Sequence, residues 1–303
     1  MKDLLKISDL NSVAFKKLID LAIEFKKNPF KSIDLLKGET VTLYFSKSSL
    51  RTRVSFETAV VRLGGHPITT TSNDYTLGQR ETIHDVAKNV ERFSKAYVIR
   101  TYKDSDVEEF AKHATIPVVN ALTDGHHPCQ ALADIMTMIE HGKKSIAYFG
   151  DANNVAISLM EACVLMGYDF KIASPEGYDM PKVNKEWAIE KALTTGSKLT
   201  FTNDPIEAAK DVDALYSDVW MSMGDDKALK DVKFKALAPY QVNEELYKHS
   251  NDGAIFLHCL PAHRGEEVSE GIIDGPMSKV FDEAENRLHT AQAVLFALLT
   301  KAI

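Results

Sequence analysis

Short apolar runs alternate with amphipathic stretches along most of the chain. The apolar runs are rich in β-branched and aromatic residues, which is typical of strands, whereas the stretches between them repeat their apolar positions with helical spacing. The predicted strands are Val41–Phe45, Pro67–Thr71, Ala96–Arg100, Pro117–Asn120, Ser145–Phe149, Phe170–Ser174, Lys198–Thr202, Ala214–Ser217 and Ile255–His258. The predicted helices are Ser12–Lys27, Arg53–Leu63, Ile83–Phe93, Asp106–His113, Gln130–His141, Val155–Met166, Lys185–Thr194, Pro205–Ala209 and Glu283–Lys301. This alternation indicates βαβ units and parallel sheets covered on both faces.

The number of strands indicates two domains. So many predicted strands are unusual for one sheet, so we assign the first four to one α/β domain and the last five to another. The helix Gln130–His141 lies at the junction. We therefore expect an α/β fold of two domains, each a parallel β-sheet flanked by helices, with the active site in the interdomain cleft.

Composition and charge exclude several classes of protein. The 303 residues carry a net charge of -7 without a basic run, which argues against nucleic acid or a membrane surface as a partner. No apolar run approaches the roughly 20 residues that span a bilayer, and the charged N-terminus does not resemble a signal peptide. Three widely spaced cysteines without a metal-binding motif favour free thiols and a cytoplasmic location.

The most informative segment is Ser48–Arg53, which follows the first predicted strand. Hydroxyl groups and cations alternate there at a strand-to-helix junction, where unpaired N–H groups and the helix dipole favour an anion. Together these features predict a phosphate site. The simpler alternative is an N-cap serine followed by two solvated arginines.

Further polar segments follow other predicted strands. Because ligands of open α/β sheets bind beyond the carboxyl ends of the strands, these segments suggest one shared cleft. They are Arg100, Asp124–Gln130, Gly150–Asn154, Asp218–Gly224 and Cys259–Pro261. Each of them could also be an ordinary turn or helix start. Pro128 is a common first helical residue, Asn153 and Asn154 could cap a helix, and Cys259 could be a small buried apolar residue.

Several segments together resemble the aspartate/ornithine carbamoyltransferase family, and within it the ornithine carbamoyltransferase branch. The matching segments are Ser49–Arg53, His127–Gln130, Gly150–Asn154, Asp218–Gly224, His258–Pro261 and Glu285–Arg287. The resemblance covers almost the whole chain. It implies transfer of a carbamoyl group from carbamoyl phosphate to the side-chain amine of L-ornithine, which gives L-citrulline and phosphate in a step of arginine biosynthesis. It implies no metal and no organic cofactor.

The resemblance also implies domain roles and site residues. Residues 1–134 would bind carbamoyl phosphate, with the helix 286–303 packing back on them, and residues 135–285 would bind ornithine. The residues implied for carbamoyl phosphate are Ser49, Leu50, Arg51, Thr52, Arg100, His127, Gln130, Leu260 and Arg287. Those implied for ornithine are Asn154, Asp218, Ser222, Met223 and Cys259. Among these, the catalytic residues would be Arg100, His127, Cys259 and Arg287. We interpret Gly224 as a possible hinge of a lid over the acceptor, which predicts ordered binding with carbamoyl phosphate first.

The resemblance further implies a homotrimer whose sites are shared between subunits. The loop Tyr75–Glu81 would reach the neighbouring site. Two positions depart from the family pattern. Leu50 stands where threonine is common, and Thr76 stands where histidine or glutamine makes the contact, so Gln79 or Arg80 could replace it.

Three alternatives remain open at this stage. The first is a carbamoyltransferase with another acceptor, such as acetylornithine, succinylornithine, putrescine or aspartate; the carboxylate of Asp218 favours a free α-amino group. The second is a nucleotide-binding oxidoreductase, which the segment Gly150–Asn154 disfavours because it is not GxGxxG. The third is a non-catalytic relative, which the intact set of candidate residues disfavours.

Overall fold

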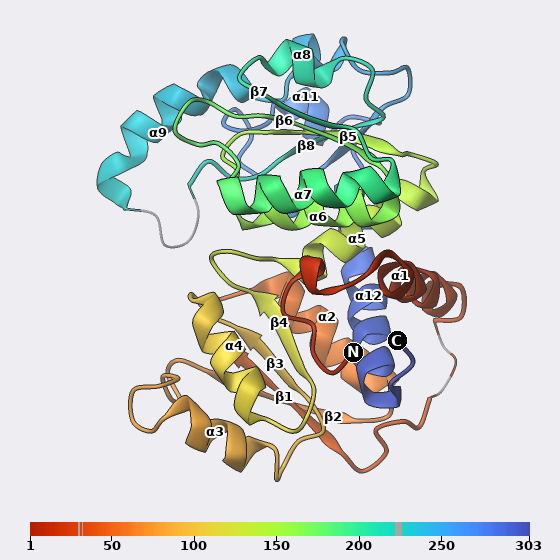
Figure 1. Ribbon diagram of the computed structural model, residues 1–303, viewed down its shortest axis with the longest axis vertical. Coiled ribbons are helices and arrows are strands. Elements are labelled where there is room, and N and C mark those ends of the chain that lie inside the picture. The colour runs from red at the N-terminus through yellow and green to blue at the C-terminus, as the bar shows by residue number, and fades with distance from the viewer. Residues whose placement is uncertain (30, 32, 222–225) are drawn as a thin grey trace. The chain divides into compact units, whose positions relative to one another are not determined.

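The computed structural model describes residues 1–29, 31, 33–221 and 226–303 (Figure 1). The chain divides into two compact units. Unit 1 comprises Met1–Ala133 and Glu285–Ile303, and unit 2 comprises Asp134–Ala284. Each unit is an α/β layered structure, as the alternation of apolar runs predicts. The α/β class and the two parallel sheets are therefore confirmed.

Unit 1 is built on a parallel sheet of four strands in the order β2-β1-β3-β4. Its strands are β1 (Thr40–Phe45), β2 (His66–Thr71), β3 (Tyr97–Arg100) and β4 (Val118–Leu122). Its helices are η1 (Ile7–Asp9), α1 (Ser12–Lys27), α2 (Leu50–Arg62), α3 (Ile83–Val90) and α4 (Asp104–His113), together with the first part of α5 (Pro128–Glu140) and most of α12 (Val280–Thr300). An apolar cluster joins α3 and α4 to one face of the sheet, and α2 covers β1 and β2 (Figure 1).

Unit 2 is built on a parallel sheet of five strands in the order β7-β6-β5-β8-β9. Its strands are β5 (Ser145–Phe149), β6 (Asp169–Ala173), β7 (Leu199–Thr202), β8 (Ala214–Ser217) and β9 (Ile255–Leu257). Its helices are α6 (Asn154–Met166), α7 (Lys182–Thr195), α8 (Pro205–Ala209), η2 (Lys227–Leu229), α9 (Lys230–Leu237), η3 (Ala238–Tyr240), α10 (Glu244–Tyr247) and α11 (Glu270–Ile273). Helices α6 and α7 lie on one face and α8 and α11 on the other (Figure 1).

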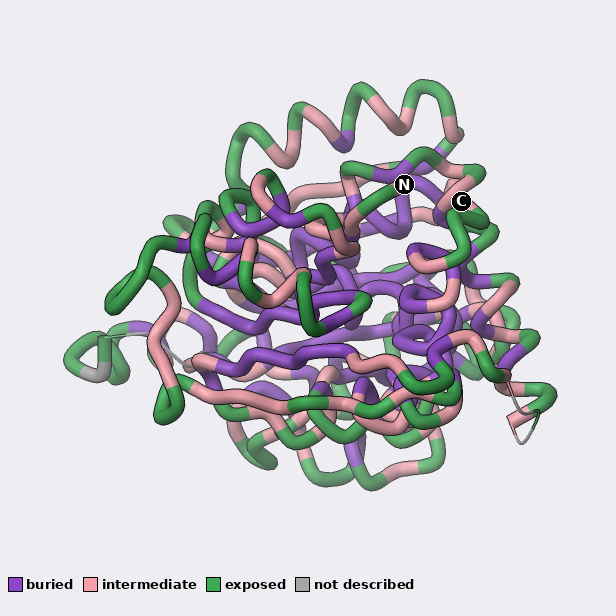
Figure 2. The backbone as a smooth tube through the Cα atoms, turned by 90° about the horizontal axis from the view of Figure 1, so that it is seen from below, coloured by how far each residue is buried: buried purple, intermediate pink, exposed green. Residues whose placement is uncertain are grey.

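Burial differs among the strands of each sheet. The inner strands β1, β3, β5 and β8 are buried along nearly their whole length, and so are the edge strands β4 and β9, whereas the edge strands β2 and β7 are half-exposed. Figure 2 shows buried backbone in purple and exposed backbone in green. Strands covered by helices on both faces need apolar side chains on both, which explains why their sequences read as continuous apolar runs. Among the described residues, no helix combines the length and apolarity that crossing a membrane requires.

Helix starts differ most from the sequence predictions. Helix α2 begins at Leu50, before the predicted start at Arg53, because the Ser49 hydroxyl caps it by accepting a hydrogen bond from the Thr52 N–H at 3.3 Å. Helix α5 begins at Pro128 rather than Gln130. Helices α9, α10 and α11 were not predicted, because they are short and lack a sustained helical repeat.

Candidate active site

The first turn of α2 holds the predicted phosphate segment. Ser49 is the N-cap, Arg51 and Thr52 lie in the first turn, and Leu50 is 74% exposed, so only its backbone could serve a ligand. Arg53 departs from the prediction, because its Nε donates to Glu57 at 2.9 Å on the exposed face of the helix. The simpler alternative is therefore correct in that Ser49 is an N-cap. It also holds for Arg53, which is on the surface and pairs with Glu57.

Arg287 on α12 ties the phosphate segment to the start of α5. Its Nη2 donates to Thr52 Oγ1 at 3.1 Å, and its Nη1 donates to Gln130 Oε1. All three side chains are buried. The structure therefore brings together three of the residues assigned to carbamoyl phosphate, although Arg287 is 235 positions from Thr52 in sequence.

His127 completes a cationic cluster in unit 1. Burial lowers the pKa of its imidazole well below the ordinary value, and Arg287, Arg100 and Arg51 lower it further. The ring is therefore neutral at neutral pH, and it can donate one N–H bond without adding charge. Arg100 lies at the end of β3 and is also buried. Three guanidinium groups beside one neutral donor are suited to a doubly charged anion and an adjacent carbonyl oxygen.

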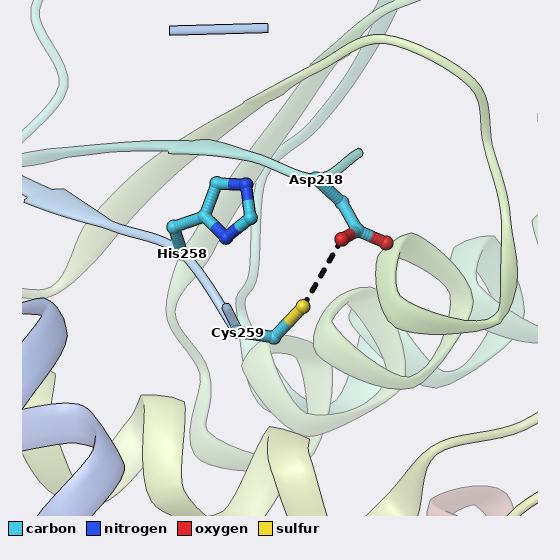
Figure 3. Close-up of side chains that lie close together, drawn as sticks. All are labelled: Asp218, His258 and Cys259. Atoms are coloured by element: carbon cyan, nitrogen blue, oxygen red, sulfur yellow. Dashed lines mark hydrogen bonds between the residues drawn. The ribbon is translucent and has the colours of Figure 1, made fainter. Parts of the chain in front are cut away.

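Asp218 is the centre of a second polar cluster, in unit 2. Its Oδ2 accepts a hydrogen bond from Asn153 Nδ2 at 2.7 Å, and its Oδ1 accepts from the Cys259 thiol at 3.0 Å. The Val219 N–H also donates to Oδ1, at 2.8 Å. Figure 3 shows the thiol of Cys259 pointing toward this carboxylate, with His258 beside it. Burial and Asp218 raise the pKa of the Cys259 thiol well above its ordinary value, so the group is a protonated donor.

Asn153 is a residue of this cluster that sequence reasoning left as a possible cap. Its side-chain oxygen caps α6 by accepting from the N–H groups of Val155 and Ala156, while its amide nitrogen binds Asp218. Asn154, the predicted ligand of the α-carboxylate, is the first helical residue beside it. The capping role of Asn153 could have been suspected from its place two residues before the predicted helix Val155–Met166.

Leu260 and the loop after β9 have an unusual backbone. Leu260 lies in the left-handed region at φ 57°, and its N–H donates to His258 Nδ1 at 2.8 Å. On the other side of the ring, His258 Nε2 lies 3.3 Å from the buried carboxylate of Glu267. This arrangement fixes the backbone around the Leu260 carbonyl group, to which the resemblance assigns carbamoyl binding.

The remaining predicted residues belong to the segment that contains Ser222 and Met223 and to the loop Tyr75–Glu81. Ser222, Met223 and the hinge candidate Gly224 lie outside the described residues. Thr76 lines a pocket of about 260 Å³ with Tyr75, Arg80 and Glu81, and exposed Gln79 is not among its lining residues.

Two groups of side chains in the described part of the chain have ligand atoms close enough together for a metal ion. Asp218, His258 and Cys259 form one group, and His263, Glu266 and Glu267 form the other. In the first group the Cys259 thiol donates a hydrogen bond to Asp218, and His258 Nδ1 accepts one from the Leu260 N–H. We therefore interpret it as a hydrogen-bond network and assign no metal to it, and the absence of a cofactor stays a prediction.

Comparison with known proteins identifies the family. The family model described as the carbamoyl-P binding domain of aspartate/ornithine carbamoyltransferase matches residues 2–140. The model of the Asp/Orn binding domain of the same family matches residues 142–298. The chain belongs to the aspartate/ornithine carbamoyltransferase family.

Relatives within this carbamoyltransferase family match over nearly their full length. Ornithine carbamoyltransferase of Bacillus subtilis is 49% identical, with 99% of this chain and 94% of the relative covered. The anabolic ornithine carbamoyltransferase of Pyrococcus furiosus is 44% identical, with 97% of this chain and 95% of the relative covered. A solved structure of ornithine carbamoyltransferase from Pyrococcus furiosus has a TM-score of 0.95 at 44% identity and covers 100% of this chain and 98% of its own. The predicted resemblance is thereby confirmed.

Proposed function

We propose that this chain is an ornithine carbamoyltransferase that converts carbamoyl phosphate and L-ornithine to L-citrulline and phosphate, in the direction of arginine biosynthesis. The observation that carries the proposal is the 49% identity to ornithine carbamoyltransferase of Bacillus subtilis over 99% of the chain. The anabolic relative from Pyrococcus furiosus supports the direction. The two polar clusters support the proposal, because their side chains are of the kinds that this reaction needs.

We propose that the cluster of unit 1 binds carbamoyl phosphate. Ser49, Arg51, Thr52 and the Leu50 N–H would hold the phosphate at the positive end of α2. Arg100 would bridge the phosphate and the carbonyl oxygen, and Arg287 would complete the positive surroundings. Gln130 and the Leu260 carbonyl would accept hydrogen bonds from the carbamoyl NH₂ group, which has donors to match them.

In the proposed reaction, the neutral side-chain amine attacks the carbonyl carbon and the C–O bond to phosphate breaks. The negative charge that develops on the carbonyl oxygen would be stabilised by the His127 N–H and the Arg100 guanidinium. The electron pair of that bond leaves with phosphate, which is already paired with arginines, and the leaving phosphate accepts the proton that the attacking nitrogen loses. The fixed donors need no reorganisation during this step, which is the main source of their effect.

We propose that the cluster of unit 2 binds ornithine. Asp218, with Ser222, would pair with the α-ammonium group, Asn154 would bind the α-carboxylate, and Met223 would make backbone contacts. The Cys259 thiol would orient the side-chain amine rather than act as a nucleophile, because its raised pKa leaves little thiolate. A free ornithine amine has a pKa similar to that of lysine, so the cationic neighbourhood favours the neutral, attacking form. The reaction requires both clusters to face one cleft.

We also propose a cytoplasmic homotrimer that shares its sites through the loop Tyr75–Glu81. The pocket lined by Thr76 and Arg80 supports this proposal, because a group of a neighbouring subunit could bind there. Arg80 is a better candidate than Gln79 to replace the usual contact, because it lines that pocket. Three cysteines without any disulfide support a reducing location.

The experiment that tests the proposal is citrulline formation by the purified protein with carbamoyl phosphate. Ornithine is compared with acetylornithine, putrescine and aspartate. Turnover with ornithine alone would support both halves of the site. Turnover with a different amine would retain the carbamoyl phosphate half and overturn the assignment of Asp218 to an α-ammonium group. A folded protein without turnover on any amine would be a non-catalytic relative.

A further inference from the structure

The turn Thr123–His126, which delivers His127 to the cationic cluster, is tied to a single carboxylate. Asp104, the first residue of α4, accepts a hydrogen bond from the Thr123 hydroxyl at 2.6 Å and from the Gly125 N–H at 3.1 Å. Its Oδ1 also lies 2.8 Å from His126 Nδ1. One side chain therefore contacts three of the four residues that precede His127.

Gly125 permits this close approach. A Cβ atom added to Gly125 would lie 2.4 Å from Asp104 Oδ2, which is far inside contact distance. Any other residue at this position would force the Asp104 carboxylate to move, so the contact in its present form requires glycine. The sequence is adapted to the contact on both sides, with a carboxylate on one side and glycine on the other.

The same turn is held from two further directions. The Asp124 N–H donates to the Tyr102 carbonyl at 2.7 Å, and the Asp124 side chain forms an ion pair with buried Lys47. The Thr123 N–H donates to the His126 carbonyl at 2.9 Å, which closes the turn. Lys47 and Tyr102 lie in the segments that follow β1 and β3, so the three polar segments beyond the strand ends of unit 1 are joined here.

We propose that Asp104 is a positioning residue for the reaction, because it fixes the turn that places the His127 ring against the carbonyl oxygen of carbamoyl phosphate. This inference rests on the proposed function and adds to it a residue that no sequence motif singled out. Asp104 itself touches no reacting atom. It acts through the backbone that leads into His127 and α5.

The charge state of Asp104 suits this role. Partial burial would raise the pKa of the carboxyl group, but hydrogen bonds from His126 and Thr123 outweigh burial and lower it. The group is therefore an ionised acceptor at neutral pH. An asparagine at this position would keep one acceptor oxygen but would turn an N–H donor toward Thr123 or Gly125.

The test compares Asp104→Ala and Asp104→Asn with Asp106→Asn, which removes a carboxylate from the same first turn of α4 without touching the Thr123–His126 turn. Steady-state citrulline formation is measured, together with calorimetric binding of inorganic phosphate and of phosphonoacetamide, a stable compound that adds an amide carbonyl to the anion. We expect Asp104→Ala to lower kcat at least about tenfold and to raise the dissociation constant of phosphonoacetamide at least about fivefold. The dissociation constant of phosphate should stay within about twofold of the wild-type value. The kcat and the phosphonoacetamide affinity of Asp104→Asn should lie between those of Asp104→Ala and the wild type.

A double-mutant cycle with His127→Ala separates positioning from general loss of structure. If Asp104 acts through His127, Asp104→Ala should cause no further loss of kcat in the His127→Ala background. Additive losses of kcat in the double variant would overturn the inference, and so would an equal loss of affinity for phosphate and for phosphonoacetamide. If Asp104→Ala does not fold, Gly125→Ala tests the same contact from the other side. An inactive wild type would contradict the proposed function instead, so the two failures are distinguishable.

Discussion

At the scale of single residues, Arg287 shows how one side chain assembles a site from distant segments. Its two terminal nitrogens bind Thr52 on α2 and Gln130 on α5. The planar fork of a guanidinium makes two directed bonds at once, which an ammonium group cannot do with the same geometry. Burial strengthens both bonds because the surroundings screen them less than water does.

We expect Arg287→Lys to keep the charge but lower kcat/KM for carbamoyl phosphate at least about tenfold, because the forked contact is lost. The matched control is Arg264→Lys, which alters an exposed two-point ion pair with Asp274. Exposed pairs contribute at most about 1 kcal/mol, so the control should be nearly as active and as stable as the wild type. Equal activity of the Arg287 variant and the control would contradict the assigned role.

Glu267 makes the pH dependence of stability testable. Burial would raise the pKa of this carboxyl group, but the adjacent His258 imidazole and a hydrogen bond from the His263 N–H lower it below the ordinary value. A carboxyl group with a lowered folded-state pKa stabilises the protein above its unfolded-state pKa, and this stabilisation is lost as the pH falls through the folded-state value.

We therefore expect Glu267→Gln to be less stable than the wild type at pH 7 and the difference to shrink as the pH falls below about 4.5, the ordinary glutamate value. Urea unfolding at a series of pH values measures this. Glu245→Gln, which removes an exposed pair with Lys248, should stay close to the wild type throughout. If the difference in unfolding free energy between Glu267→Gln and the wild type stays constant from pH 7 to pH 3, the ionised carboxylate is not what stabilises the contacts with His258 and His263.

At the scale of elements, the neighbouring helices α6 and α7 differ in how many of their residues are buried. Every residue of α6 from Val155 to Leu165 is buried, whereas Ala188 is the buried residue of α7. The Asn153 cap fixes the start of α6, and Gly167 ends it in the left-handed conformation. A helix that is buried on all sides is stabilised mainly by packing, so its apolar side chains should tolerate truncation poorly.

The same substitution on the two helices tests this difference. We expect Leu159→Ala on α6, where the side chain is fully buried, to cost about 2–5 kcal/mol of unfolding free energy. Leu193→Ala on α7, where the side chain is 84% exposed, should change it by less than about 0.5 kcal/mol. Denaturant unfolding followed by tryptophan fluorescence measures unit 2, because Trp187 and Trp220 both lie in it. Similar losses in both variants would contradict the burial assigned to α6.

At the scale of the whole molecule, the proposed shared site makes activity depend on assembly. Light scattering after size exclusion should give a mass three times that of the 33.7 kDa chain. Dilution below the dissociation constant of the trimer should abolish turnover, because each site would lose the loop Tyr75–Glu81 of a neighbour. A monomeric species with full activity would overturn the shared site without affecting the proposed reaction.

The sequence determined the fold class, the run of strands and helices, and most of the candidate residues. The fold class and the elements depend on local patterns, namely short apolar runs and helical spacing, and such patterns can be read without knowing the tertiary structure. The candidate residues came from polar segments after strands together with the resemblance to the carbamoyltransferase family. Helix starts were less well predicted, as at Leu50 and Pro128, because side-chain caps and proline decide the first turn.

The tertiary structure decided which of those residues act together. Packing of α12 on unit 1 brings Arg287 to Thr52, whereas Arg53, only one residue from Thr52, turns to Glu57 on the exposed face. The contacts of Asn153 with Asp218 and of Asp104 with Thr123 are hydrogen bonds between segments that are separated in sequence. Distances between such segments are set by packing of the sheets and helices, which leaves no short motif in the sequence.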